Sequence, residues 1–353
     1  DNTQPLKPYL DSDQIIALAK SKQVDAIHPG YGFLSENAEF ARKCAANKII
    51  FIGPSPEVMD ALGDKITAKK IAVRCNVPII ESNQQNLKSL KIALAEASKI
   101  GYPLMLKAAS GGGGRGMRII RTADDLELHF NSARNESLNA FGDDTMFLEK
   151  YVEDPKHIEV QIVADNHGNI RHLYERDCSV QRRHQKVVEI APSYNVSKIV
   201  KHQLYDFSLA IAKEVNYNNV GTVEFLIDRD ENVYFIEVNP RIQVEHTVTE
   251  MVTGIDLIKT QIFVAGGYKL QDKQIKIYDQ ESIATYGFAL QCRLTTEDPE
   301  NDFTPDYGTI TTYRSASGMG IRLDAGSIYQ SYSVSPFFDS MLVKVSAHGR
   351  TLD

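Results

Sequence analysis

The segment GTVEFLIDRDENVYFIEVN (221–239) contains two apolar runs, rich in β-branched and aromatic residues, that flank four polar residues. This pattern predicts an antiparallel hairpin. If its turn is centred between Asp230 and Glu231, then Glu224 and Glu237 lie directly opposite each other on one face. A register slip of one residue would move a side chain to the other face, so this pairing constrains the fold around it.

The acidic pair in this hairpin needs a positive partner. Like charges that face each other across two strands destabilise a sheet unless a cation lies between them. Asn239 falls on the same face, one side chain further along. Two carboxylates and an amide oxygen are the hard ligands that Mg²⁺ prefers. The hairpin therefore predicts a magnesium site, with a solvent-exposed polar face as the alternative.

The polar pattern continues past the hairpin. From residue 237 to 245 every second residue is polar, in the series Glu237, Asn239, Arg241, Gln243 and Glu245. In an extended chain such residues share one face. We therefore expect acids, amides and a guanidinium to follow one another along a single strand.

A glycine loop, SGGGGRG (110–116), lies between the predicted strands YPLMLKAA and MRIIR. Glycine allows close backbone approach, so successive N–H groups can surround a phosphate. The loop lacks the Lys-Ser/Thr pair of a P-loop, and a mobile hairpin tip is the alternative. Lys107 precedes it in an apolar strand, where a lysine needs an anion as partner or reaches solvent at the sheet edge.

A basic run, ERDCSVQRRHQK (175–186), supplies five further cationic or titratable groups. They are Arg176, Arg182, Arg183, His184 and Lys186. Clustered guanidinium and ammonium groups indicate an anion pocket, and a solvated basic face is the alternative. Lys65 and His157, taken alone, are equally compatible with a structural or surface role.

The order of predicted elements divides the chain into three parts. Residues 1–80 alternate helices with strands, which indicates a parallel, doubly wound α/β layer. Residues 81–152 predict a small α+β unit that carries the glycine loop, and residues 153–353 predict a mainly antiparallel series of strands. The helices are expected at 13–23, 36–48, 56–75, 87–101 with Gly101 as cap, 122–138 with Thr122 as cap, 197–215 and 247–265.

Composition excludes several classes of protein. The net charge of −7 argues against a general nucleic-acid or membrane-surface binder, and no apolar run reaches the length of a membrane span. The four cysteines are widely spaced, which predicts reduced thiols in an intracellular protein. We expect bacterial cytoplasm or mitochondrial matrix, not secretion. Both ends of the sequence look cut, so a piece of a longer protein is expected.

Taken together, these clusters predict an ATP-using ligase, and the sequence resembles the biotin carboxylases of the ATP-grasp superfamily. The resemblance covers nearly the whole chain and keeps the family's motif order. The matching stretches are HPGYGFLSEN (28–37), FIGPS (51–55), GDK (63–65), SGGGGRGM (110–117), FLEKYVEDPKHIEVQ (147–161), ERDCSVQRRHQKVVEIAP (175–192) and EVNPRIQVEHTVTEM (237–251).

Within this family, the sequence is most similar to the biotin carboxylase part of pyruvate carboxylases. Asn239-Pro240-Arg241, QCRLTTEDPENDFTPDYGTI and GMGIRLDAG carry that similarity. Biotin carboxylase components of acetyl-CoA, propionyl-CoA or urea carboxylases are the alternative enzymes. Carbamoyl phosphate synthetases and purine enzymes of the superfamily share the metal hairpin but not the other motifs. A truncated nucleotide-binding scaffold without activity is the alternative outside enzymes.

The resemblance implies a fold and a reaction. The fold would be ATP-grasp, with a truncated doubly wound N-terminal domain, a small mobile glycine-loop lid domain and a C-terminal, mainly antiparallel β domain. The reaction would be ATP and bicarbonate giving carboxyphosphate, followed by carboxyl transfer to N1 of biotin. Mg²⁺ or Mn²⁺, ATP and a biotin carrier would take part. Carrier and carboxyltransferase domains or subunits and a homodimer would be the partners, without nucleic acid or membrane.

The resemblance also implies roles for individual residues. Nucleotide contacts would come from Lys65, Lys107, Gly111, Gly112, Gly113, Gly114, Glu149, Lys150, Val152, His157 and Gln181. The metal ligands would be Glu224, Glu237 and Asn239, which agrees with the hairpin register. The bicarbonate and biotin groups would be Arg241, Gln243, the Val244 backbone, Lys186, Arg293 and Tyr31, with Glu245 as the general base. One departure is that the family's first strand–glycine loop–helix unit and its last helices are absent from this sequence, which puts activity of this piece alone in doubt.

Overall fold

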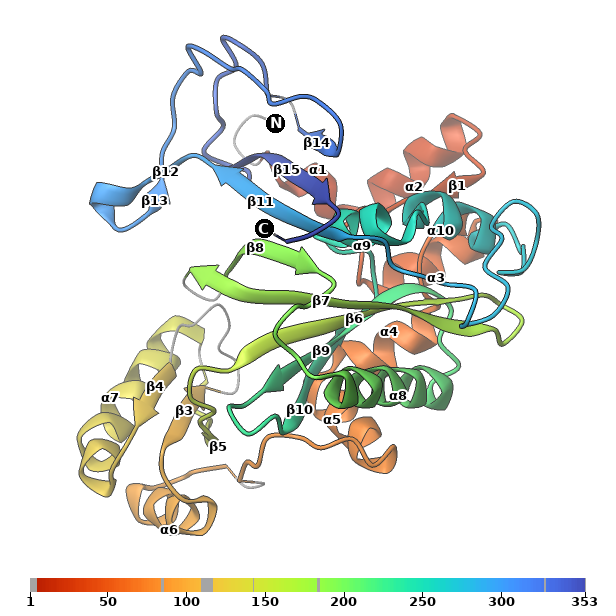
Figure 1. Cartoon of the computed structure of the whole chain (residues 1–353). Coiled ribbons are helices and arrows are strands. Elements are labelled where there is room, and N and C mark those ends of the chain that lie inside the picture. Colours follow the sequence, from red (N-terminus) through yellow and green to blue (C-terminus); the bar gives the residue numbers. More distant parts are fainter. Residues whose placement is uncertain are drawn as a thin grey trace.

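An eight-stranded antiparallel sheet forms the centre of the computed structural model, which describes residues 5–83, 86–108, 117–141, 143–182, 185–326 and 328–352. The strand order is β10-β9-β6-β7-β8-β11-β15-β14 (Figure 1). Their bounds are β6 (Lys156–Ala164), β7 (Ile170–Arg182), β8 (Gln185–Ala191), β9 (Asn219–Ile227), β10 (Val233–Asn239), β11 (Phe288–Thr295), β14 (Ile321–Ala325) and β15 (Met341–Gly349). Strands between residues 156 and 349, except for a short separate pair near residue 300, thus share one sheet.

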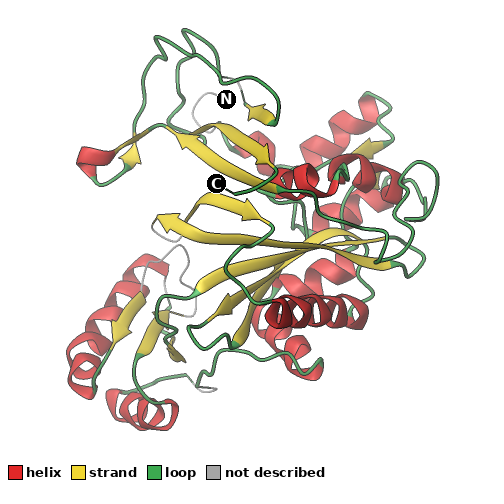
Figure 2. Ribbon diagram, in the orientation of Figure 1, coloured by secondary structure: helices red, strands yellow, loops and turns green. Residues whose placement is uncertain are grey.

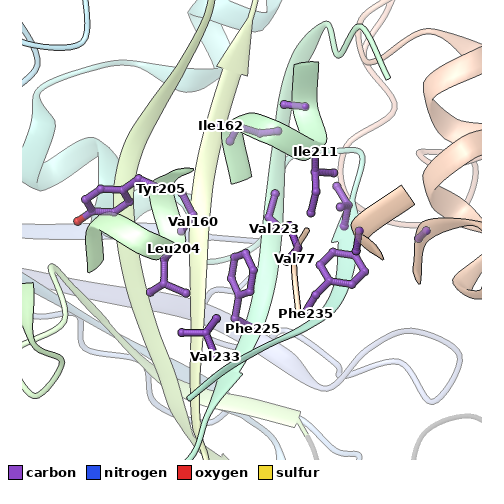
Figure 3. Packing of buried hydrophobic residues seen from close by; sticks show 14 of the residues in the cluster. Val77, Val160, Ile162, Leu204, Tyr205, Ile211, Val223, Phe225, Val233 and Phe235 are labelled. Atoms are coloured by element: carbon purple, nitrogen blue, oxygen red, sulfur yellow. The ribbon is translucent and has the colours of Figure 1, made fainter. Parts of the chain in front are cut away.

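The two faces of this sheet bury different chemistry. In β6, Val160 and Ile162 belong to one buried apolar cluster with Phe225 and with Leu204, the latter from helix α8 (Lys198–Glu214) (Figure 3). Alternate residues such as Glu159 are also fully buried, but on the opposite face. A buried polar face requires hydrogen-bond partners for every group. The sheet therefore has an apolar face beneath α8 and a polar face on which charged groups gather.

The N-terminal part contains a two-stranded parallel pair, β1 (Ala26–Ile27) with β2 (Ile50–Phe51). Five helices belong to this part of the described chain, and Figure 2 draws them in red among the helices at its centre and right. They are α1 (Lys7–Leu10), α2 (Ser12–Ser21), α3 (Ala38–Ala46), α4 (Pro56–Gly63) and α5 (Lys65–Arg74). The prediction of one helix over 56–75 is wrong. Asp64 adopts an extended conformation and accepts a 2.8 Å bond from the Thr67 amide, so it caps a second helix.

A small unit with its own core follows. Its three-stranded sheet has the order β4 (Met117–Ile120), β3 (Leu104–Ala108) and β5 (Met146–Lys150), and α6 (Leu90–Ile100) and α7 (Ala123–Phe141) cover it at the lower left of Figure 1. Gly101 ends α6 with φ +81°, and Thr122 Oγ1 accepts the Asp125 amide at 3.1 Å, so both predicted caps are confirmed. The glycine loop, 110–116, lies outside the described residues.

The prediction of one helix over 247–265 is also wrong. Helix α9 (His246–Thr253) ends at Gly254, which takes the left-handed conformation with φ +71°. Asp256 then caps α10 (Leu257–Ala265) by accepting from the Lys259 amide.

The short strands β12 (Glu297–Asp298) and β13 (Thr304–Pro305) pair with each other, around the 3₁₀ turn η1 (Pro299–Asn301). Among the described residues, no helix has the length and apolar character to cross a membrane.

Candidate active site

The hairpin of β9 and β10 brings the two predicted acids together. Glu237 pairs with Glu224, as the sequence predicts. Nearer the turn, however, Phe235 pairs with Phe225, one residue off the predicted register. A β-bulge at Ile236 inserts one extra residue and restores the pairing of the acids. The predicted pair is therefore confirmed, but the turn alone does not produce it.

Glu224 is buried among cations and amides. Its Oε1 accepts from Lys186 Nζ, Asn239 Nδ2 and Gln243 Nε2, each at 2.8 Å, and its Oε2 lies 2.6 Å from His157 Nε2. Burial alone would raise the pKa of Glu224. The charge of Lys186 and the bond from His157 outweigh burial, and they hold the pKa well below its ordinary value. Glu224 is thus an ionised carboxylate on the polar face.

The negative charge of Glu237 has fewer nearby cations and hydrogen-bond donors than that of Glu224. Lys65 Nζ lies 3.7 Å from it, and this lysine is largely exposed. Burial, followed by repulsion from Glu224, raises the pKa of Glu237. A carboxylate in this state favours an added cation, which fits a divalent metal between the two acids. Asn239 adjoins them, but its Oδ1 accepts from Arg241 Nη2 at 2.9 Å, so its amide nitrogen faces Glu224.

Glu159 is a member of the cluster that the sequence reasoning missed. It lies opposite Glu224 in the β6–β9 ladder and accepts from Lys186 Nζ at 2.5 Å. Ligand atoms of His157, Glu159 and Glu224 lie within 4.8 Å of one another, as do those of Glu159, Cys178 and Glu245. The signal was the alternation of polar residues in HIEVQ, within a strand buried on both faces.

Lys186 is the central cation of the polar face. From β8 it donates to Glu159, Glu224 and Glu245, the last two at 2.8 Å. Burial would lower the pKa of this ammonium, but the carboxylates, with Glu159 first, raise it far above its ordinary value. One ammonium thus neutralises part of three buried negative charges.

The two arginines of the basic run that the structure describes have partners within the protein, and Arg182 and Lys186 also line a cavity. Arg176 is fully buried and donates to Glu159 at 2.5 Å and to Gln243 at 3.0 Å, among other side-chain acceptors. Arg182 forms an ion pair with Glu297 and lies over the Phe303 ring. Both guanidinium groups bind acceptors within the protein, because buried acceptors on the polar face of the sheet require hydrogen-bond donors. Arg183 and His184 lie outside the described residues.

The predicted continuation of the strand beyond Asn239 is wrong. β10 ends at that residue, and 240–245 form an irregular connection into α9. Pro240 has no N–H to donate, so the ladder stops there. The polar groups still converge. Arg241 Nε lies 3.0 Å from Glu36, and the Val244 carbonyl accepts from Lys344 Nζ at 2.7 Å.

Glu245 is the buried carboxylate at the start of α9, held between two cations. Lys186 Nζ lies 2.8 Å from one oxygen, and Arg293 Nη2 lies 3.0 Å from the other. Arg293, on β11, also binds Glu189 at 2.6 Å. Burial raises the pKa of Glu189 more than Arg293 lowers it. Glu189, like Glu159, is a buried acid that sequence reasoning missed.

A cavity of about 770 Å³ opens beside this carboxylate. Its lining includes Tyr31, Lys186, Val244, Arg293 and Lys344. The sequence places these residues far apart, but the sheet and the loop after β1 bring them to one wall. Several cations line this cavity, two of which hold Glu245, so it can bind a small anion near a carboxylate that could accept a proton.

The residues predicted to contact a nucleotide form a second group, on the small unit and its neighbours. Glu149 on β5 accepts from Lys107 and, at 2.6 Å, from Lys69 of α5. Lys150 Nζ donates to the carbonyls of Gly101 and Tyr102, each at 2.9 Å, so its side chain ties β5 to the end of α6.

The remaining nucleotide predictions have different outcomes. Gln181 Nε2 lies 2.8 Å from His157 Nδ1, which links that histidine to β7. Val152 is half-buried just after β5. The predicted contacts Gly111 to Gly114 lie outside the described residues. Lys107, expected to need an anion, has the carboxylate of Glu149 as its partner.

Gly221 on β9 permits close packing behind the acidic pair. A Cβ there would lie 1.9 Å from Tyr217 Oη and 3.2 Å from the Asn239 carbonyl. Because Tyr217 is buried and donates to Val220, it cannot move freely. We expect Gly221→Ala to lower the free energy of unfolding by about 1–3 kcal/mol, measured by urea denaturation. Gly63→Ala, with open space around the new methyl group, is the control, and equal stability of the two variants would contradict this packing.

Comparison with known families identifies three matching models along the chain. Residues 1–59 match "Biotin carboxylase, N-terminal domain", residues 64–273 match "Carbamoyl-phosphate synthase L chain, ATP binding domain", and residues 291–353 match "Biotin carboxylase C-terminal domain". The middle model is shared with carbamoyl phosphate synthases, whereas the two flanking models name biotin carboxylases.

Individual relatives agree with this result. The chain is 53% identical to a pyruvate carboxylase of Staphylococcus aureus, over 98% of the chain and 30% of that protein. It is 51% identical to the mitochondrial pyruvate carboxylase of Homo sapiens, over 98% of the chain and 29% of that protein. The chain therefore spans less than a third of the length of these relatives.

A solved structure matches over most of both chains. The biotin carboxylase domain dimer of the Hydrogenobacter thermophilus 2-oxoglutarate carboxylase, in complex with MgADP, ADP and bicarbonate, superposes with a TM-score of 0.89. It is 44% identical, and the match covers 99% of this chain and 75% of that one. The resemblance and the fold class expected from the sequence are both confirmed.

Proposed function

The chain belongs to the biotin carboxylase family, and from that premise we propose that it catalyses the ATP-dependent carboxylation of biotin. ATP and bicarbonate would give ADP and carboxyphosphate, and the carboxyl group would pass to N1 of biotin with release of phosphate. The observation that carries this proposal is the buried carboxylate of Glu245, held between Lys186 and Arg293 beside a cavity.

In this proposal the residues at 241–245, of which Val244 lines the cavity, bind and deprotonate bicarbonate. Arg241 and Gln243, with the Val244 backbone, would hold the planar anion, because a guanidinium binds such a group through two parallel bonds. Glu245 would take its proton. Arg293 would then stabilise the negative charge on biotin, and Tyr31 would line the biotin side of the cavity.

The nucleotide would lie between the acidic hairpin and the small unit. Lys65 and Lys107 would bind phosphates, with the glycine loop (Gly111 to Gly114) around them. Glu149, Lys150, Val152, His157 and Gln181 would complete the nucleotide site. Glu224, Glu237 and Asn239 would hold Mg²⁺ or Mn²⁺, which neutralises charge on transferring phosphoryl groups. Asn239 would have to turn its oxygen towards the metal.

We propose that the complete protein is a pyruvate carboxylase, because relatives with that name share about half of the residues over this chain. Its partners would be the biotin carrier and carboxyltransferase parts and a second copy of this chain. Bacterial cytoplasm or mitochondrial matrix would be its compartment. The division at residues 80 and 152 remains a prediction.

The direct test measures ADP release from the purified chain with Mg-ATP, with and without bicarbonate and free biotin. The proposal expects release that requires bicarbonate and rises with biotin. If the chain alone is silent, the assay is repeated on the longer protein that contains it. If the longer protein also released no ADP, the proposed reaction would be contradicted. If the longer protein released ADP, the additional segments would be needed to complete the biotin-binding part of the site.

A further inference from the structure

Lys344 is a buried lysine that no predicted role includes. It lies on β15, directly opposite Arg293 of β11 on one side and Asp324 of β14 on the other. Only 4% of its surface is exposed, and it lines the cavity beside Glu245. Residues directly opposite in antiparallel strands have neighbouring side chains, so Lys344 and Arg293 are two like charges in adjacent places.

The neighbouring acids are engaged by other groups. Asp324 accepts two bonds from Arg322, each at 2.9 Å. Glu189 and Glu245 both form ion pairs with Arg293. Within the described parts of the chain, Lys344 makes no ion pair closer than 4.0 Å, and it donates a hydrogen bond to the Val244 carbonyl. Burying an ammonium without a paired carboxylate is unfavourable, so stability alone does not explain a lysine here.

The Val244 carbonyl belongs to the peptide that joins Val244 to Glu245. The side chain of Glu245 is fixed by Lys186 and Arg293, but its backbone precedes α9 without a side-chain cap. The bond from Lys344, at 2.7 Å, is therefore what fixes the orientation of this peptide from the sheet side. A shift of about 1 Å in a positioned group costs up to about 100-fold in rate.

We propose that Lys344 is a positioning residue for carboxylation, which holds the Val244–Glu245 peptide so that the carboxylate and the adjacent backbone meet bicarbonate correctly. This inference rests on the proposed function and names a residue that acts on the bicarbonate step alone. Lys65 and Lys107, which we assign to the ATP phosphates, do not line the same cavity. The role is therefore separable from nucleotide binding.

The first test compares Lys344→Met with Lys344→Arg in the longest active form of the protein. For Lys344→Met we expect kcat/KM for bicarbonate to fall at least about tenfold, while KM for ATP stays within about twofold. Its melting temperature should stay equal or rise, because the substitution removes a buried charge that has no paired carboxylate. Lys344→Arg, which can still donate to the carbonyl, should restore part of the bicarbonate step.

Two results would overturn the inference. One is an unchanged kcat/KM for bicarbonate in Lys344→Met. The other is a joint fall of melting temperature and of activity with both substrates, which would assign the lysine a structural role. Lys70→Met, at an exposed position on α5, is the matched control and should change neither measurement.

A second measurement separates this inference from the proposed reaction, because it needs no turnover. Amide hydrogen exchange of the segment 241–246 is followed by mass spectrometry in the parent and in Lys344→Met. We expect exchange to become faster in the variant within this segment and to stay unchanged in β9. Equal exchange in both proteins would contradict the fixing of the peptide, even if the carboxylation assay succeeds.

Discussion

Replacement of Glu245 by glutamine should lower the rate of bicarbonate-dependent ADP release by about 100- to 10,000-fold, the range that a general base contributes. Glutamine keeps the shape of the side chain but cannot take a proton. Lys186 retains Glu159 and Glu224 as partners, and Arg293 retains Glu189, so the surrounding network persists. The loss should therefore appear in kcat, with KM for ATP nearly unchanged.

The matched control for this substitution is Glu281→Gln, which makes the same chemical change at an exposed position. It should leave the rate unaltered. The measurement is steady-state ADP release with saturating Mg-ATP and bicarbonate. If Glu245→Gln retained more than about a tenth of the parent rate, another group would have to be the base.

Replacement of Lys186 by methionine should affect both stability and activity strongly. It leaves three buried carboxylates, Glu159, Glu224 and Glu245, without their common cation. Removing one partner of a buried ion pair costs about 3–5 kcal/mol, since the remaining charges stay buried without compensation. We expect a lower urea midpoint and loss of measurable carboxylation. Both are measured at pH 7.5, and the unfolding experiment is done without added metal.

The effect should be specific to the buried site. Lys70→Met removes a lysine from the surface of α5 and should change the urea midpoint little. If Lys186→Met unfolded at the same urea concentration as the parent, the three carboxylates would have to be protonated or separated in solution. Either would contradict the charged cluster that the structure describes.

Local sequence patterns predicted the elements of the site, but not the irregularities between them. The predicted pairing of Glu224 with Glu237 is confirmed, but it depends on an irregularity as well as on alternation and the turn. The bulge at Ile236 was not predicted, because it inserts a residue that alternation alone cannot reveal. Similarly, the helix breaks at Asp64 and Gly254 depend on cap and left-handed conformations within segments whose apolar pattern continues on both sides.

The partners of charged groups could not be predicted locally. The sequence predicted Arg176 as part of a basic run that binds anions or faces solvent. It lies fully buried, because β6, β9 and α9 supply hydrogen-bond acceptors from distant segments. The partners of Glu159 and Lys344 could not be predicted from the local sequence either. Each is an ordinary charged residue in a strand, and only the order of strands in the sheet shows that they approach Glu224 and Val244.

The eight-stranded sheet also has a consequence for how the chain folds. The groups around Glu245 come from β6, β8, β11 and the start of α9, so they meet only when strands distant in sequence have paired. Contacts of long sequence separation form slowly. During refolding, helical signal should return before catalytic competence, and a fragment that ends before β11 should lack Arg293, one of the two cations that hold Glu245. Activity is thus a late reporter of chain assembly, as well as a property of the site.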